Sequence, residues 1–302
     1  AQKRSCGCWS GRYYGIFRSS APNADAKALS AQAIFKSKTY ICQAQRRSAD
    51  RIRNAVCAAV SILAFLTIWQ LATMFSHLGE LIPSPIEVVQ YLFTVDKIGR
   101  RTFLQHSLVS LSRVLIAYSA ACVVGITLGL LMGWYPKVKA IFMPLFNIIR
   151  PIPPIAWTSL AILWFGLGEM PKWFIIFIAA FCNVVINAFD GARSVDTTLV
   201  GCAKMLGARD NQIFTKIVLP ASVPYIFAGM QIALSNSWAA VVAAEMIRAS
   251  EGLGWVIVTG MSVNNMKQIF AGIVIIGIIG LLLSIIMRTL EGRLLRWNRS
   301  GI

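Results

Sequence analysis

Six stretches of this chain contain no charged side chain over about the length that crosses a lipid bilayer. A helix of about 20 apolar residues, rising ~1.5 Å per residue, spans the ~30 Å hydrocarbon core. A water-soluble helical core does not need so many helices of this length, so the pattern predicts an all-α membrane protein with six transmembrane helices. The uncharged stretches lie between Arg53 and His77, between Arg113 and Lys137, between Arg150 and Glu169, from Trp173 to Phe189, from Ile217 to Ala244 and from Gln268 to Met287.

The composition excludes other classes of protein. Of the 302 residues, 57% are hydrophobic and 14% are charged, whereas soluble domains average ~45–50% and ~25%. The net charge of +17 is of a size that attracts nucleic acid. Its placement argues against that partner, because the basic residues gather before the first span and at the ends of the apolar stretches. No alternation of aromatic and basic residues provides a surface for stacking bases. We expect contact with membrane lipid and no nucleic-acid partner.

The distribution of basic residues also predicts the topology. With the N-terminus in the cytoplasm, fourteen Lys and Arg residues lie at the cytoplasmic ends of the spans and seven at the opposite ends. This bias predicts a multi-pass protein with both termini cytoplasmic. Residues 1–50 are basic and lack periodicity, so we expect a disordered tail there; an organellar transit peptide is the alternative, which would imply an organellar membrane. Residues 51–302 form the expected transmembrane domain, with its core at 100–290 and a cytoplasmic loop at 190–220.

No motif for catalysis or metal binding is present. Three of the seven cysteines lie inside apolar stretches, where a thiol behaves as a small apolar group. The only histidines are His77 and His106, and no zinc-ligand spacing or His-Glu-x-x-His sequence occurs. The phosphate-binding sequence Gly-x-x-x-x-Gly-Lys-[Ser/Thr] is absent as well, so the chain is not itself a P-loop ATPase. We expect no catalytic residue, no metal site and no bound cofactor.

The third stretch is interrupted by the segment Arg150-Pro151-Ile152-Pro153-Pro154. If the preceding segment is helical from Lys139, Arg150 lies ~16 Å into the bilayer, close to its midplane. The prolines remove backbone donors and break the helix, and irregular backbone at that depth requires protein or a watery cavity beside it. Arg150 therefore either attracts an anionic substrate or is neutralised by the backbone carbonyls that the break exposes.

The loop at 190–220 predicts two short helices joined by a glycine. Asp196 or Thr197 caps the first helix, Gly207 ends it in a left-handed conformation, Asp210 begins the second helix and Pro220 opens the fifth span. An exposed apolar stripe of this kind favours a partner protein. The apolar side chains of the first helix recur at i, i+3, i+4 and i+7: Leu199, Cys202, Ala203 and Leu206.

This loop resembles the Glu-Ala-Ala ("EAA") loop of ABC-importer permeases. Ala203, Gly207, Ile217, Leu219 and Pro220 match the motif at its spacing, whereas Gly201 replaces the usual glutamate and Cys202 replaces the first alanine. Four further segments resemble the branch of taurine, aliphatic sulfonate, nitrate and bicarbonate permeases, and the proline-rich one is most similar to taurine-type permeases. These segments are Arg150–Trp157, Trp164–Glu169, Trp238–Glu245 and Gly252–Trp255.

The resemblance implies a type I ABC importer permease fold and a transport subunit without enzymatic activity. It implies a homodimer in the bacterial inner membrane, with separate ABC ATPase subunits that use ATP-Mg and a periplasmic solute-binding protein that delivers the substrate. The implied substrate is taurine or another small sulfonate, with nitrate, bicarbonate or another small nutrient as the alternative. The residues implied to couple to the ATPase are Leu199, Gly201, Cys202, Ala203, Leu206, Gly207 and Pro220.

A second set of residues is expected to line the substrate pathway. Trp238 is equally well explained as a packed core residue, and Glu245 as the partner of Arg248 in an i, i+3 ion pair. An ion-coupled secondary transporter and a non-transporting scaffold are the rival classes. The absence of an internal repeat disfavours the first, and the cost of a midplane arginine disfavours the second. The expected pathway residues are Arg150, Pro153, Trp157, Asn236, Trp238 and Glu245.

Overall fold

The computed structural model describes residues 53, 56–74, 82–95 and 97–295. The chain divides into two compact units, 1–68 and 69–302. The predicted N-terminal tail, residues 1–50, lies outside the described residues. Of the first unit, residue 53 and residues 56–68 are described, and the latter belong to the helix Val56–Met74.

Within the described residues, five helices are long and apolar enough to cross a membrane, and a bent pair of helices makes a sixth candidate. These correspond in order to the six predicted spans, and the described part of the chain has no β-strand beyond one isolated bridge between Ile98 and Arg101. The prediction of an all-α membrane fold is confirmed. The spans are Val56–Met74, Phe103–Trp134 (α3), Pro136–Ile149 (α4) with Pro154–Phe165, Met170–Arg193 (α6), Asp210–Ile247 and Met266–Leu294 (α11).

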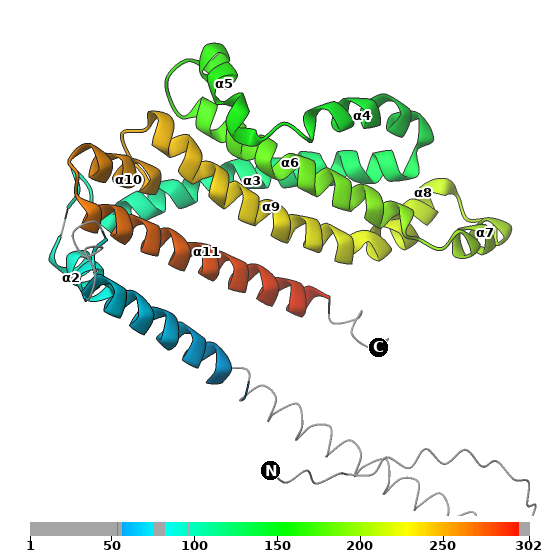
Figure 1. Ribbon diagram of the computed structural model, residues 1–302. Helices are drawn as coiled ribbons and strands as arrows, with labels where there is room; N and C mark the ends of the chain where they lie inside the picture. Colours follow the sequence, from blue (N-terminus) through cyan, green and yellow to red (C-terminus); the bar gives the residue numbers. More distant parts are fainter. Residues whose placement is uncertain (1–52, 54–55, 75–81, 96, 296–302) are drawn as a thin grey trace, which may run out of the picture. The chain divides into compact units, whose positions relative to one another are not determined.

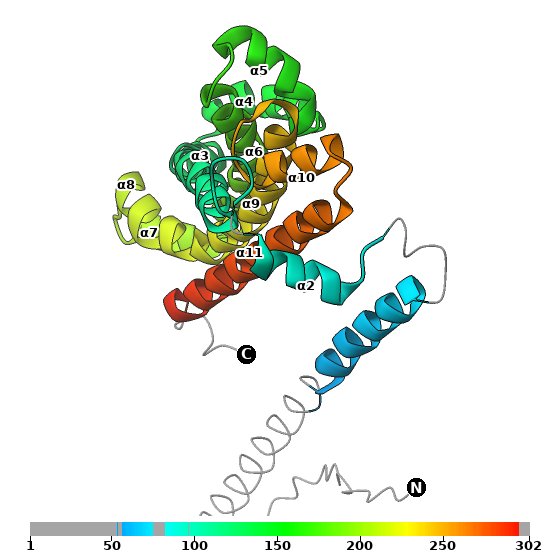
Figure 2. The same cartoon turned by 90° about the vertical axis from the view of Figure 1, so that its left-hand side faces the viewer.

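Shorter helices join these spans (Figures 1 and 2). The fifth span consists of the single turn α8, a π-helical turn and the long helix α9. The π-helical turn covers Phe214–Val218, just before the proline that opens α9. The remaining helical elements are α2 (Pro85–Thr94), a 3-10 turn (Pro154–Trp157), α5 (Thr158–Phe165), α7 (Thr197–Met205), α8 (Asp210–Ile213), α9 (Leu219–Arg248) and α10 (Leu253–Ser262).

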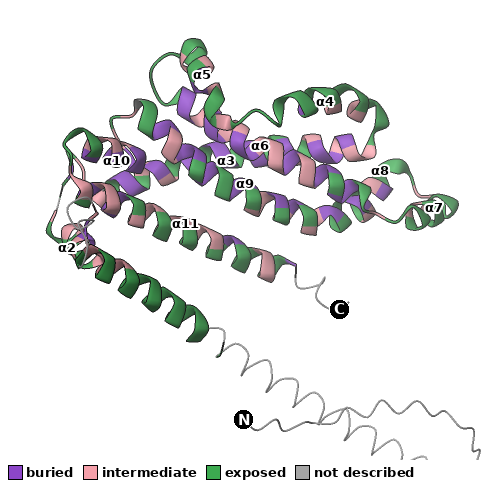
Figure 3. Ribbon diagram, in the orientation of Figure 1, coloured by how far each residue is buried: buried purple, intermediate pink, exposed green. Residues whose placement is uncertain are grey.

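Helices α3, α6 and α9 form the packed centre of the second unit, where the buried residues concentrate (Figure 3). Ile176 and Val184 of α6 are fully buried against α3 and α9. Helices α3 and α6 approach closely because Gly129 of α3 has no side chain where it meets α6. A Cβ at this position would lie 2.5 Å from the carbonyl oxygen of Val185. The Gly125-x-x-x-Gly129 spacing thus serves helix packing, as small residues do inside membranes.

The third span is broken where the prolines predict it. Helix α4 ends at Ile149, and the segment Pro154–Phe165 leaves at 90° to it. Arg150 is the C-cap residue of α4, and its backbone N–H donates to the carbonyl of Phe146 (2.9 Å). The prolines that follow cannot donate such bonds, and this explains why the helix ends there.

Candidate functional site

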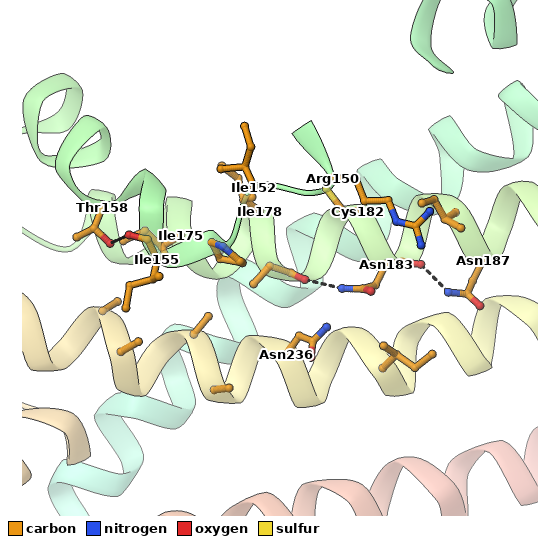
Figure 4. A pocket seen from close by; sticks show the side chains of 18 residues that line it. Arg150, Ile152, Ile155, Thr158, Ile175, Ile178, Cys182, Asn183, Asn187 and Asn236 are labelled. Atoms are coloured by element: carbon orange, nitrogen blue, oxygen red, sulfur yellow. Dashed lines mark hydrogen bonds between the residues drawn. The ribbon is translucent and has the colours of Figure 1, made fainter. Parts of the chain in front are cut away.

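A cavity of about 610 Å³ lies where the broken span meets α6 and α9 (Figure 4). The irregular segment and α5 form one side of it, and the facing surfaces of α6 and α9 form the others. The break therefore opens beside a cavity, as irregular backbone within a membrane requires. The side chains that line it are Arg150, Ile152, Pro154, Ile155, Thr158, Ile175, Ile178, Ala179, Cys182, Asn183, Ile186, Asn187, Ile232, Asn236, Ala239, Ala240, Ala243 and Ala244.

Arg150 is the single charged residue of this lining. Its guanidinium points from the break toward the part of α6 that carries Asn183 and Asn187, and the amide of Asn236 rises from α9 on the opposite side (Figure 4). Asn183 Nδ2 donates to the carbonyl of Ala179, and Asn187 Nδ2 donates to that of Asn183, both at 2.8 Å. Each amide keeps a second N–H and a carbonyl oxygen free of these bonds. The polar part of the cavity is thus cationic and rich in donors.

The cavity gathers two of the six predicted pathway residues, Arg150 and Asn236. Pro153 is exposed, and the half-buried Trp157 has an indole N–H without a hydrogen-bond partner among the described residues; neither belongs to the lining. Trp238 is buried in the main core, where its Nε1–H donates to the carbonyl of Ile276 (3.1 Å), so it holds α9 to α11. The prediction of pathway contact for Trp157 and Trp238 receives no support from this cavity.

Two lining residues that sequence reasoning missed are Asn183 and Asn187 of α6. Their spacing of four residues places both amides on one helix face. Polar amides within an otherwise apolar span are the signal that identifies them, because such groups inside membranes mark polar contacts or pathways. Cys182, which sequence reasoning treated as an inert apolar group, also reaches the cavity wall.

Glu245 lies outside the cavity, in a buried cluster of charged groups around Arg113. Arg113 Nη1 donates to Glu245 Oε1 (2.7 Å), while its Nε and Nη2 donate to the two oxygens of Glu169 (2.5 and 2.7 Å). The side chains of Arg113 and Glu245 are 5% and 0% exposed. Sequence reasoning paired Glu245 with Arg248, whose side chain lies outside the described atoms; the residue bonded to Glu245 is Arg113, 132 positions away.

Backbone and hydroxyl donors complete the hydrogen bonding of Glu245. Ser110 Oγ lies 2.8 Å from both carboxylate oxygens, and the backbone N–H of Gly254 donates to Oε2 (3.0 Å). Ser110 Oγ in turn accepts the N–H of Leu253 (2.9 Å). The cluster therefore joins α3, the end of α9 and the start of α10. No local sequence pattern could reveal it, because the bonds of Arg113 and Ser110 to Glu169, Glu245 and Leu253 all connect distant segments.

Glu169 is the half-exposed member of this cluster, with 45% of its side chain accessible. It also accepts a hydrogen bond from Lys172 Nζ (2.8 Å). Partial burial acts to raise the pKa of Glu169, but the hydrogen bonds and positive charges of Arg113 and Lys172 outweigh it and hold the pKa below the ordinary value of glutamate. The carboxylate is therefore ionised at neutral pH and ties the turn before α6 to α3.

The loop between α6 and α9 has the predicted elbow. Asp196 caps α7 by accepting the N–H of Thr198 (2.8 Å), and Gly207 adopts a left-handed φ of 82°. The backbone N–H groups of Gly207 and Ala208 donate to the carbonyls of Lys204 and Ala203, both at 3.0 Å, which closes the helix end. Helix α8 then begins at Asp210 as expected.

The exposed face of α7 differs in part from the predicted stripe. Leu199 and Cys202 are exposed, and Leu206 is 88% exposed. Ala203 instead packs against the buried cluster beneath the loop. Met205, which sequence reasoning passed over, is 82% exposed and extends the apolar surface. A Cβ at Gly201 would meet no atom within 4 Å, so packing does not require glycine there.

Comparison with known proteins now identifies the chain. Residues 125–299 match the family described as the binding-protein-dependent transport system inner membrane component. The chain belongs to this family. The matched region contains the break, the cavity, the elbow and most of the charged cluster, so each feature described above is part of a permease.

Relatives with stated transport roles match over most of their length. The taurine transport permease TauC of Escherichia coli is 33% identical over 252 residues, 82% of this chain and 91% of the relative. The nitrate import permease NrtB of Synechocystis is 35% identical over 245 residues, 77% and 86% of the two chains. The bicarbonate transport permease CmpB of Synechococcus elongatus is 33% identical over 259 residues, 82% and 92%.

The fold has a solved counterpart. A chain of the MetNI methionine ABC transporter in an inward-facing conformation matches with a TM-score of 0.53 at 17% identity, covering 60% of this chain and 91% of that chain. The protein is therefore a multi-pass membrane permease with the fold of type I ABC importers. It is a transport component and not an enzyme, and permeases of this kind work with an ATPase and a binding protein.

Proposed function

We propose that this permease conducts a small anionic or zwitterionic solute, taurine or an alkanesulfonate, across the bacterial inner membrane. The observation that carries the proposal is the Arg150 cavity, which presents a guanidinium and three amides at the break in the third span. A guanidinium binds oxyanion groups, tetrahedral ones included, through paired hydrogen bonds. Broken helices near the middle of transporters commonly hold the substrate site.

Nitrate or bicarbonate is the second candidate substrate. The nitrate and bicarbonate permeases are as similar to this chain as the taurine permease is, at 33–35% identity. Each of these solutes carries an oxyanion group that the Arg150 guanidinium could bind. The proposed substrate is therefore any small solute with an oxyanion head group, and a sulfonate is the preferred one.

The proposed motor is a separate pair of ABC ATPase subunits that use ATP-Mg and bind two copies of this chain at α7. Leu199, Met205 and Leu206 give that helix an exposed apolar face, and such a face on a cytoplasmic loop favours a protein partner. Cys202 and Gly207 belong to the same contact, and Pro220 anchors the loop to α9. In this arrangement both termini are cytoplasmic, and a periplasmic binding protein delivers the solute to the opposite side.

The test is uptake into proteoliposomes that contain the permease, its ATPase and its binding protein. Uptake should require ATP, and Leu206→Asp should abolish both ATPase co-purification and uptake, because it places a charge in an apolar contact. Val263→Asp is the matched control, since Val263 is an exposed aliphatic residue in the α10–α11 turn; it should leave both intact. Uptake driven by an ion gradient without the ATPase would refute the proposal.

A further inference from the structure

The lining of the Arg150 cavity is sorted by polarity along its length. Toward the end of α6 that carries Arg193, the wall holds Arg150, Asn183 and Asn187. Toward the opposite end, the wall consists of aliphatic side chains of α6, small side chains of α9 and Thr158, whose hydroxyl is used in a hydrogen bond to the carbonyl of Ile155 (2.7 Å). Ile175 and Ala179 pack there with Ala240 and Ala244 in a buried apolar cluster. One cavity therefore has a cationic, donor-rich half and an apolar half.

The alanines keep the apolar half open. Ala240, Ala243 and Ala244 present only methyl groups along the cavity face of α9, opposite the aliphatic part of α6. Larger side chains at these positions would fill the space that the cavity occupies. The apolar half is consequently suited to a short hydrocarbon chain, which gains ~0.8 kcal/mol per methylene removed from water.

The polar half offers an ammonium only neutral amide oxygens and no group of opposite charge. None of the lining side chains is a carboxylate or an aromatic ring. Among the described acids, Asp190 lines a separate cavity of about 60 Å³ that also touches Arg150, yet the two side chains form no ion pair within 4.0 Å. A buried cation requires such a partner. The cavity therefore pairs a negative head group with the Arg150 charge and gives a positive one no ion pair.

We propose that this cavity is a binding site for a short amphiphilic monoanion. Its oxyanion head binds the Arg150 guanidinium and the amides of Asn183, Asn187 and Asn236, and its hydrocarbon chain lies along Ala240, Ala243 and Ala244. This inference rests on the proposed function and narrows it: the permease itself favours alkanesulfonates over taurine, which adds an ammonium, and over nitrate, which has no chain.

Cys182 supplies a reporter, because its side chain lines the cavity beside the polar half. The experiment uses the permease–ATPase complex without the binding protein, so that the binding protein cannot select the ligand. Cys202 of the proposed ATPase contact is kept, the other five cysteines are replaced by alanine, and peptide mass spectrometry reads the alkylation of Cys182 separately. The rate of Cys182 alkylation by N-ethylmaleimide is measured against rising concentrations of methanesulfonate, propanesulfonate, butanesulfonate, taurine and nitrate. Half-protecting concentrations should fall about fourfold per added methylene, with taurine and nitrate protecting least.

Two variants with matched controls locate the head and the chain. Arg150→Gln should raise every half-protecting concentration about tenfold or more, since it removes a charge-assisted hydrogen-bonding group; Arg150→Lys should retain part of the protection. Lys97→Gln removes an exposed cation outside the cavity and should change nothing. Ala243→Leu should abolish the preference for longer chains while methanesulfonate still protects, whereas Ala120→Leu on the exposed face of α3 should not.

Equal protection by all five anions, or protection unchanged in Arg150→Gln, overturns the assignment of this site. Such a result leaves the proposed function standing if the same complex, with the binding protein restored, still imports solute with ATP. Failure of the ATPase to assemble with the unmodified permease would instead refute the proposed function. Co-purification of the ATPase with each variant confirms that the variant has folded, so a change in protection can be attributed to the cavity.

Discussion

Two arginines of this permease lie in opposite surroundings. Arg113 is 5% exposed and donates to two carboxylates and to the backbone carbonyl of Glu251 (2.9 Å). Arg150 is exposed, lines a cavity and forms no ion pair with any described residue. The chain thus satisfies one membrane arginine completely with its own groups and leaves the other available.

The difference separates a structural role from a functional one. A buried ion cluster needs every partner in place, since each unpaired charge costs several kcal/mol (~3–5). The Arg113 cluster meets this demand and holds α3, α9 and α10 together. Our proposal is that Arg150, which has no ion-pair partner among the described residues, gains its partner from outside the chain. We therefore expect substitutions around Arg113 to lower stability and substitutions at Arg150 to lower transport.

The largest effect is expected for Glu245→Ala. It removes the fully buried carboxylate that binds Arg113, Ser110 and the N–H of Gly254, and should cost ~3–5 kcal/mol of stability. The measurement is thermal unfolding of the purified complex. Glu245→Gln keeps the acceptor and should recover part of the loss. A melting temperature equal to that of the unmodified protein would contradict the structural role of the cluster.

The second effect in size is on transport, from Arg150→Gln. ATP-driven uptake into proteoliposomes should fall ~10- to 100-fold, as expected for the loss of hydrogen bonds to a charged group. Thermal unfolding of the complex should not change, because no described carboxylate pairs with Arg150. A clear fall in the unfolding temperature of Arg150→Gln would show that Arg150, like Arg113, has a structural role, and would contradict the prediction.

A smaller loss of stability is expected for Gly252→Ala. Gly252 has a φ of 112°, and an added Cβ would collide with the carboxylate of Glu245. Strain of this kind costs ~1–3 kcal/mol. Gly277→Ala is the control, since a Cβ there meets no atom within 4 Å and the backbone is helical. An unfolding temperature that falls for Gly252→Ala and not for Gly277→Ala supports the cluster geometry.

The smallest effect is a pH dependence that originates at Glu169. Because its pKa is lowered in the folded protein, the bond to Arg113 stabilises fully above the ordinary glutamate pKa of ~4.3 and is lost as the pH falls through the lowered value. Exposure limits the contribution to under ~1 kcal/mol. Glu169→Gln should remove this acid-limb loss from unfolding curves recorded between about pH 3 and 6; an unaltered acid limb would assign it to other groups.

The sequence predicted the features that depend on local chemistry. Uncharged stretches located the spans, prolines located the break after Arg150, and Asp196 with Gly207 located the ends of α7. These signals act within a few residues and need no knowledge of what packs against them. The six-helix fold and the elbow could therefore be predicted correctly from the sequence.

The features that sequence reasoning missed depend on contacts between distant segments. Glu245 of α9 binds Arg113 of α3, and no residue near Glu245 in the sequence indicates this pairing. For Trp238 the sequence left pathway contact and core packing open, and its N–H donates to the carbonyl of Ile276 in α11. Asn183 and Asn187 reach the cavity because α6 faces the break. The rotation of each helix about its axis, set by packing, decides which residues line a cavity.

The open space around Gly201 has a consequence for the exchange of partners between relatives. Where the family motif has glutamate, this chain has no side chain, and the position is free of neighbouring atoms. If α7 is the ATPase contact, the ATPase that serves this permease meets no carboxylate at position 201. An ATPase adapted to the usual glutamate would lack the hydrogen-bond acceptor that the glutamate provides. Gly201→Glu would meet no steric clash with the described residues of the chain. This single substitution therefore tests whether the ATPase of a relative can bind this permease.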